Sequence, residues 1–86
     1  MEDKHLIEQA IRKVIREQRN ESGKTQAKLA EEAGLSEKHL NKIENGKKNT
    51  SGASLFQLLL ALGSQDPMIL RIAEVYREIK SKNTND

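Results

Sequence analysis

The amino-acid sequence predicts an all-α protein in which five helices form one domain. Three observations lead to this prediction. Apolar residues recur every three or four positions, glycines and capping residues divide the chain into short segments, and no segment alternates as a strand does. A chain of 86 residues fits one domain with a thin core. We expect this domain to span residues 1–80 and residues 81–86 to form a frayed polar tail.

The expected helix boundaries follow from capping residues and glycines. Ser, Thr and Asp favour a helix N-terminus, Pro suits its first position, and Gly favours the C-terminus because it readily adopts the left-handed conformation. The first expected helix begins at about residue 6 and is stopped by Gly23, and the last runs from Asp66 and Pro67 to about Lys80. Between them we expect three short helices: 26–33 between Thr25 and Gly34, 37–45 between Ser36 and Gly46, and 52–62 between Ser51 and Gly63.

The composition argues against several kinds of site. The chain has no cysteine, which excludes disulfides and thiolate metal sites and suits a reducing cytosol. No apolar run approaches the about 18 residues of a membrane span, and the N-terminus does not resemble a signal peptide. We expect a soluble protein of the cytoplasm with no cofactor, no metal and no small-molecule ligand. The net charge of +2 lies within residues 16–48, an asymmetry too small to indicate a partner by itself.

A short connection between two of the expected helices carries the functional signal. Only Gly34, Leu35 and Ser36 separate the helix 26–33 from the helix 37–45, and so short a link forces the two to cross sharply. Two helices joined by a short glycine turn are typical of DNA-binding proteins, although such turns also join ordinary helices.

The helix 37–45 has one apolar and one polar face. At about 100° per residue, its polar residues fall within an arc of about 140°, and Leu40 and Ile43 lie opposite. The polar residues are Glu37, Lys38, Asn41, Lys42 and Asn45. Lysine can donate to guanine, asparagine can pair with adenine and glutamate can accept from cytosine. The alternative is a solvated outer face, as on most charged helices.

The segment 15–63 resembles the lambda-repressor-like (Cro and phage-repressor, XRE-type) helix-turn-helix proteins. The resemblance lies in the stretch TQAKLAEEAGLS, the turn IENGK and the closing LLLALG. It implies a five-helix bundle that binds double-stranded DNA in a sequence-specific manner, associated with the nucleoid of a bacterium or with a phage.

The resemblance also implies roles for individual residues. Glu37, Lys38 and Lys42 fall at the base-reading positions of the family, and Asn41 shares their face. The positions that hold the DNA backbone are those of Gln26, Asn45, Lys47 and Lys48, with Lys24 and Thr25 as weaker candidates that could equally be exposed side chains. Arg19 and Glu44 match a structural ion pair between the first helix and the end of the third.

The last two helices carry more apolar surface than one domain needs. Leu60 stands where the family has a polar residue, so the helix 52–62 is apolar nearly all round. The last helix carries two apolar stripes, of which one can cover the domain. Either the first helix covers both stripes, or the second lies in a two-fold dimer. We expect a homodimer whose interface contains Phe56, Leu60, Ile69, Ile72 and Tyr76.

These patterns favour a small transcriptional regulator, a repressor that binds an inverted-repeat operator as a dimer. The alternative is the antitoxin of a toxin–antitoxin pair, which uses the apolar surface to bind a protein and regulates its own synthesis through DNA. An enzyme has little support, because there is no cysteine nucleophile, metal-ligand cluster or phosphate loop. His5 and His39 belong to different helices and are expected to be surface histidines.

Overall fold

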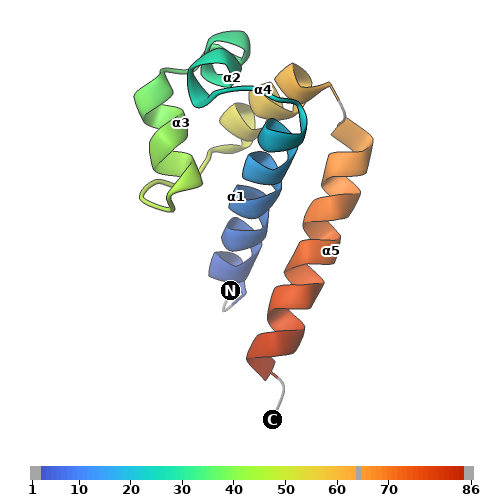
Figure 1. Cartoon of the computed structure of the whole chain (residues 1–86). Helices are drawn as coiled ribbons and strands as arrows, with labels where there is room; N and C mark the ends of the chain where they lie inside the picture. The colour runs from blue at the N-terminus through green and yellow to red at the C-terminus, as the bar shows by residue number, and fades with distance from the viewer. Residues whose placement is uncertain (1–2, 64, 85–86) are drawn as a thin grey trace.

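The computed structural model describes residues 3–63 and 65–84, and all regular structure in this part of the chain is helical (Figure 1). The helices are α1 (Lys4–Glu21), α2 (Gln26–Ala33), α3 (Glu37–Glu44), α4 (Gly52–Leu62) and α5 (Gln65–Thr84). The prediction of an all-α, five-helix bundle is therefore confirmed.

Hydroxyl side chains begin the three short helices, as the sequence indicates. Thr25, Ser36 and Ser51 each accept a hydrogen bond from the backbone N–H three residues later, at 3.0 to 3.1 Å. Each bond satisfies one of the N–H groups that a helix N-terminus leaves without an intrahelical acceptor. These caps explain why the expected starts of α2, α3 and α4 agree with the structure.

Helix α5 is longer at both ends than the sequence suggested. It begins at Gln65 rather than at Pro67, because proline is tolerated anywhere in a first turn, where its missing N–H has no intrahelical acceptor. It ends at Thr84 rather than near Lys80, since no glycine or proline interrupts residues 81–84. The side chain of Asp66, expected as the cap, and residues 85–86 of the expected tail lie outside what the structure describes.

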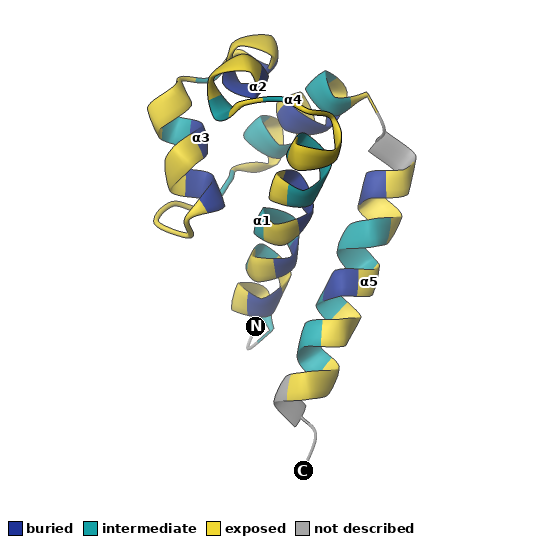
Figure 2. Ribbon diagram, viewed as in Figure 1, coloured by how far each residue is buried: buried dark blue, intermediate teal, exposed yellow. Residues whose placement is uncertain are grey.

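The core consists of two adjoining clusters. The first lies among α1, α2, α3 and α4, and its buried members are Ile15, Leu29, Ala30, Ala33, Leu40, Ile43 and Leu58. The second lies among α1, α4 and α5, and its buried members are Ala10, Val14, Leu59, Met68 and Val75. Figure 2 shows these buried positions on the inward sides of the helices. The first cluster fixes α2 and α3 against α1 and α4, and the second holds α5 against α1 and α4.

Helix α5 runs antiparallel to α1 along its length (Figure 1). Near the C-terminus of α1, the Nε and Nη2 atoms of Arg71 donate to the two carboxylate oxygens of Glu17 at 3.0 and 3.1 Å. At its N-terminus, Asp3 accepts hydrogen bonds from Lys80 and, at 2.7 Å, from the Tyr76 hydroxyl. The bonds from Arg71 lower the pKa of Glu17, and those from Lys80 and Tyr76 lower the pKa of Asp3. Each bond therefore favours the ionised carboxylate.

Candidate nucleic-acid interface

The turn between α2 and α3 sets the crossing of the two helices. Gly34 has a φ of 75°, a left-handed conformation that glycine adopts without the steric cost of a Cβ atom. The next amide, that of Leu35, turns back to the carbonyl of Ala30 at 2.8 Å, and the Leu35 side chain packs against the first core cluster. Ser36 then begins α3 at once. The three-residue turn thus holds α3 at a fixed angle to α2.

Helix α3 presents the polar face that its sequence predicts. Leu40 and Ile43 are buried in the first core cluster. The polar residues Glu37, Lys38, Asn41, Lys42 and Asn45 are exposed. The apolar face anchors the helix, and the polar face is open to a ligand.

Glu44 is a buried carboxylate that joins three helices. The residue is 3% exposed, and its two oxygens accept hydrogen bonds from the Nε and Nη2 atoms of Arg19 at 2.8 and 2.9 Å. The Nε2 atom of Gln26 donates a third bond to it at 3.1 Å. Arg19 comes from α1 and Gln26 begins α2, so this carboxylate ties the end of α3 to both neighbours.

A chain of amide side chains runs from this carboxylate to the surface of α3. The Oε1 atom of Gln26 accepts from Asn41 Nδ2 at 3.0 Å, and Asn41 Oδ1 accepts from Asn45 Nδ2 at 3.1 Å. Asn45 Oδ1 in turn accepts from Arg16 Nη2 at 3.3 Å. Because Gln26 donates to Glu44, each amide has one defined orientation. Three residues expected to contact DNA therefore lie in one network.

The charged residues of the α3 face and the following loop are available to a ligand. Lys38, Lys42, Lys47 and Lys48, together with Glu37, are exposed. Within residues 3–63 and 65–84, their side chains form no hydrogen bond and no ion pair. The backbone amides of Lys47 and Lys48 both donate to the carbonyl of Lys42, at 2.9 and 3.3 Å. This turn keeps the two loop lysines next to the end of α3.

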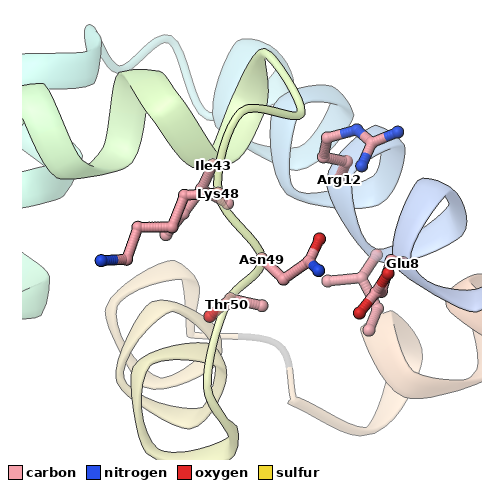
Figure 3. Close-up of a pocket in the computed structure, with 7 residues that line it drawn as sticks. Glu8, Arg12, Ile43, Lys48, Asn49 and Thr50 are labelled. Atoms are coloured by element: carbon pink, nitrogen blue, oxygen red, sulfur yellow. The ribbon is translucent and has the colours of Figure 1, made fainter. Parts of the chain in front are cut away.

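The cavity beneath this loop is too small for an organic ligand. It has a volume of about 20 Å³, which is room for about one water molecule. Its lining residues come from α1, α3 and the loop after α3 (Figure 3). Among the described residues there is no group of three or more His, Asp or Glu side chains that could hold a metal ion.

A family model described as helix-turn-helix matches residues 15–69. The chain belongs to the lambda-repressor-like helix-turn-helix family. This lambda-repressor-like protein binds DNA in a sequence-specific manner, as an XRE-type regulator. Comparisons with curated proteins and with solved structures gave no match. No helix in the described part of the chain is both long and apolar enough to cross a membrane.

The family match leaves out more than half of α1, residues 4–14, and most of α5. These two parts of the lambda-repressor-like protein pack on each other in the second core cluster. Ile72 and Tyr76, expected in a dimer interface, are half-buried there against α1. Phe56, Leu60 and Ile69 are 55%, 52% and 52% exposed, and Leu70, which the sequence did not single out, is 67% exposed. Helix α1 therefore covers part of the apolar surface that we expected to be left over.

The side chain of Lys24, unlike those of Lys47 and Lys48, bonds within the protein. Its Nζ atom donates to Glu32 at 2.5 Å and to the carbonyl of Ala61 at 3.2 Å, and the bond from Lys24 lowers the pKa of Glu32. The amine is thus directed toward the ends of α2 and α4. Thr25 uses its hydroxyl oxygen as the α2 cap, and its O–H remains able to donate.

Arg16 is the residue at this site that sequence reasoning missed. Its Nη2 atom donates to the carbonyl of Glu44 at 2.6 Å as well as to Asn45. The partners are 28 and 29 residues away, so local periodicity does not reveal them. The available signal was its position one turn before Arg19, which places both arginines on the same face of α1.

Proposed function

We propose that this lambda-repressor-like protein is a transcriptional repressor that binds an inverted-repeat operator as a homodimer. The observation that supports DNA reading by α3 is the face of that helix, on which Lys38 and Lys42 are exposed without internal ion pairs while Leu40 and Ile43 are fixed in the core. A cation held on a rigid helix without a counterion suits an anionic, grooved ligand. A regulator that binds chromosomal DNA acts in the cytoplasm, at the nucleoid.

In this proposal the α3 face reads base edges in the major groove. Glu37, Lys38 and Lys42 discriminate by charge and hydrogen bonding, and Asn41 offers an amide whose orientation the network sets. Glu37 repels phosphate and guanine acceptors, so the face rejects some sequences as well as selecting others.

The backbone contacts lie at the two ends of the helix-turn-helix. Gln26 and Thr25, at the N-terminus of α2, meet phosphate with the help of the helix dipole. Asn45, Lys47 and Lys48, just beyond α3, hold the backbone on the other side. Such contacts fix register without carrying sequence information.

The dimer rests on the exposed apolar residues of α4 and α5. Phe56, Leu60 and Ile69 each expose more than half of their surface, and burying them against a second copy removes apolar area from water. Ile72 and Tyr76 contribute the exposed parts of their side chains. A two-fold pair places two α3 helices in half-sites about one DNA turn apart.

Selection of bound duplexes from a random pool, followed by fluorescence anisotropy, tests this function. Lys38→Ala and Lys42→Ala should change which bases are preferred. Lys47→Ala should weaken binding to all sequences alike and lower the salt slope by about 0.9 per lost phosphate contact. Arg77→Ala is a matched control, because Arg77 is exposed on α5 and forms no ion pair within the described residues. Unchanged base preference in both reader variants would refute the assigned reading face.

The antitoxin function is the second candidate, and the same exposed apolar residues favour it. A toxin could cover Phe56, Leu60 and Ile69 in place of a second copy. Light scattering of the purified chain separates the two. A stable homodimer supports the repressor, whereas a monomer that recovers its DNA affinity only with the product of a neighbouring gene supports the antitoxin.

A further inference from the structure

Cationic side chains of α1 border the end of α3. Arg12, Lys13 and Arg16 line one shallow groove together with Glu44. Residues four apart on a helix share a face, so Arg12 and Arg16 lie one above the other along α1. Arg12 and Lys13 precede the segment that the family model matches.

Arg16 is fixed on the last turn of α3. Its Nη2 group bonds the carbonyl of Glu44 and the side-chain oxygen of Asn45, and its Nε atom forms an ion pair with Glu44 Oε1 at 3.7 Å. The two N–H groups of Nη1 remain, and 50% of the side chain is exposed. The cation therefore lies beside Asn45, a position assigned above to the DNA backbone.

Arg12 lies against the turn that follows α3. The guanidinium is 3.1 Å from the position that a Cβ atom at Gly46 would take. It also lines the small cavity with Lys48, on the loop that leaves this turn, and with Glu8, one turn earlier on α1 (Figure 3). Within residues 3–63 and 65–84, Arg12 forms no hydrogen bond and no ion pair. Two like charges four residues apart repel each other, and an anion that contacts both removes this repulsion.

We propose that Arg12 and Arg16 bind a DNA phosphate beside the end of α3, so that α1 takes part in DNA binding together with the helix-turn-helix. The assignment rests on the proposed function, which places Asn45, Lys47 and Lys48 against the backbone. Guanidinium groups pair with phosphate oxygens in a planar, two-bond geometry, which suits two arginines at one turn. The contact carries no base information, so it adds affinity without changing sequence preference.

The salt dependence of DNA affinity tests the site in the full chain. Arg12→Gln is the informative change, because it removes a charge and no internal hydrogen bond. Binding of a selected duplex should lose about 0.9 per protomer from the slope of log affinity against log salt concentration, with the same ranking of duplex sequences. Arg12→Lys should restore most of the slope, because lysine also contacts phosphate. Arg77→Gln should leave the slope unchanged.

Two results would overturn the site. One is an Arg12→Gln slope equal to that of Arg77→Gln in a protein that still selects its sequence. The other is a fall in affinity without a change of slope, which indicates a structural role for Arg12. If the unaltered chain itself does not select a DNA sequence, the proposed function is refuted, which is a different result from failure of the arginine site.

Discussion

The buried carboxylate of Glu44 gives the sharpest prediction about stability. Glu44→Gln keeps the size of the side chain but removes its charge and replaces one acceptor oxygen by an NH2 group. In the variant, the NH2 group faces the N–H donors of Arg19 or Gln26, which point at the carboxylate oxygens in the unaltered protein. Arg19 is left as an uncompensated cation whose side chain is 14% exposed. Removing one partner of a buried ion pair costs about 3–5 kcal/mol.

Such a loss is large for this protein. Domains of this size are stable by about 4–13 kcal/mol, so the variant should lose about a quarter or more of its free energy of unfolding. Urea titration followed by circular dichroism measures this directly, and the melting temperature should fall by about 12 °C or more. Glu21→Gln is the control. Glu21 is exposed at the end of α1, and its change should stay within about 0.5 kcal/mol.

A double-mutant cycle separates the ion pair from other effects. In an Arg19→Met background the less exposed of the two cations at Glu44 is already absent, and the half-exposed Arg16 remains with its Nε atom 3.7 Å from Glu44 Oε1. Glu44→Gln should therefore cost clearly less there than in the unaltered chain. Equal costs in the two backgrounds, or a loss below about 1 kcal/mol in the unaltered chain, would contradict the view that this pair anchors α3.

Three further predictions concern α5, the turn and Lys24. In the folded protein the pKa values of Glu17 and Asp3 lie below their ordinary values of 4.5 and 3.8. The stability that the two carboxylates add is therefore fully present above the ordinary values and is lost as the pH falls through the lowered ones. As the pH is lowered below about 4.5, the melting temperature should therefore decrease, and it should decrease less steeply with pH in Glu17→Gln. An equally steep decrease in both proteins would show that this carboxylate does not hold α5. Gly34→Ala should destabilise the protein by about 1 kcal/mol because the backbone at Gly34 is left-handed; a Cβ atom there would meet only an ordinary contact. Gly52 has open space around it and no positive φ, so Gly52→Ala should be neutral or stabilising in the same urea titration. Lys24→Met should leave the salt slope of DNA binding unchanged, because its amine bonds Glu32 and Ala61; a slope lowered by about 0.9 would show that it reaches phosphate.

The fold was predictable where a local signal sets it. Thr25, Ser36 and Ser51 begin helices because their hydroxyls cap the backbone three residues later. Gly34 ends α2 because its backbone is left-handed. The ends of α5 were less predictable, because Pro67 permits a helix start at several positions of the first turn and residues 81–84 contain no residue that stops a helix.

The site was predictable as a face but not as a network. The 100° spacing of α3 alone indicates that Lys38 and Lys42 are exposed opposite Leu40. The bonds of Arg16, by contrast, join residues about 28 positions apart, and only the packing of α1 on α3 brings them together. The same holds for Lys24, whose partner Ala61 lies on α4.

The most direct test of the account is the base preference of the chain before and after changes on α3. Duplexes selected by the unaltered protein should share a motif with two related halves about one helical turn apart, and Lys42→Ala should shift that motif while Arg77→Ala preserves it. No enriched motif, or one that Lys38→Ala and Lys42→Ala both leave unchanged, would contradict the claim that α3 reads DNA.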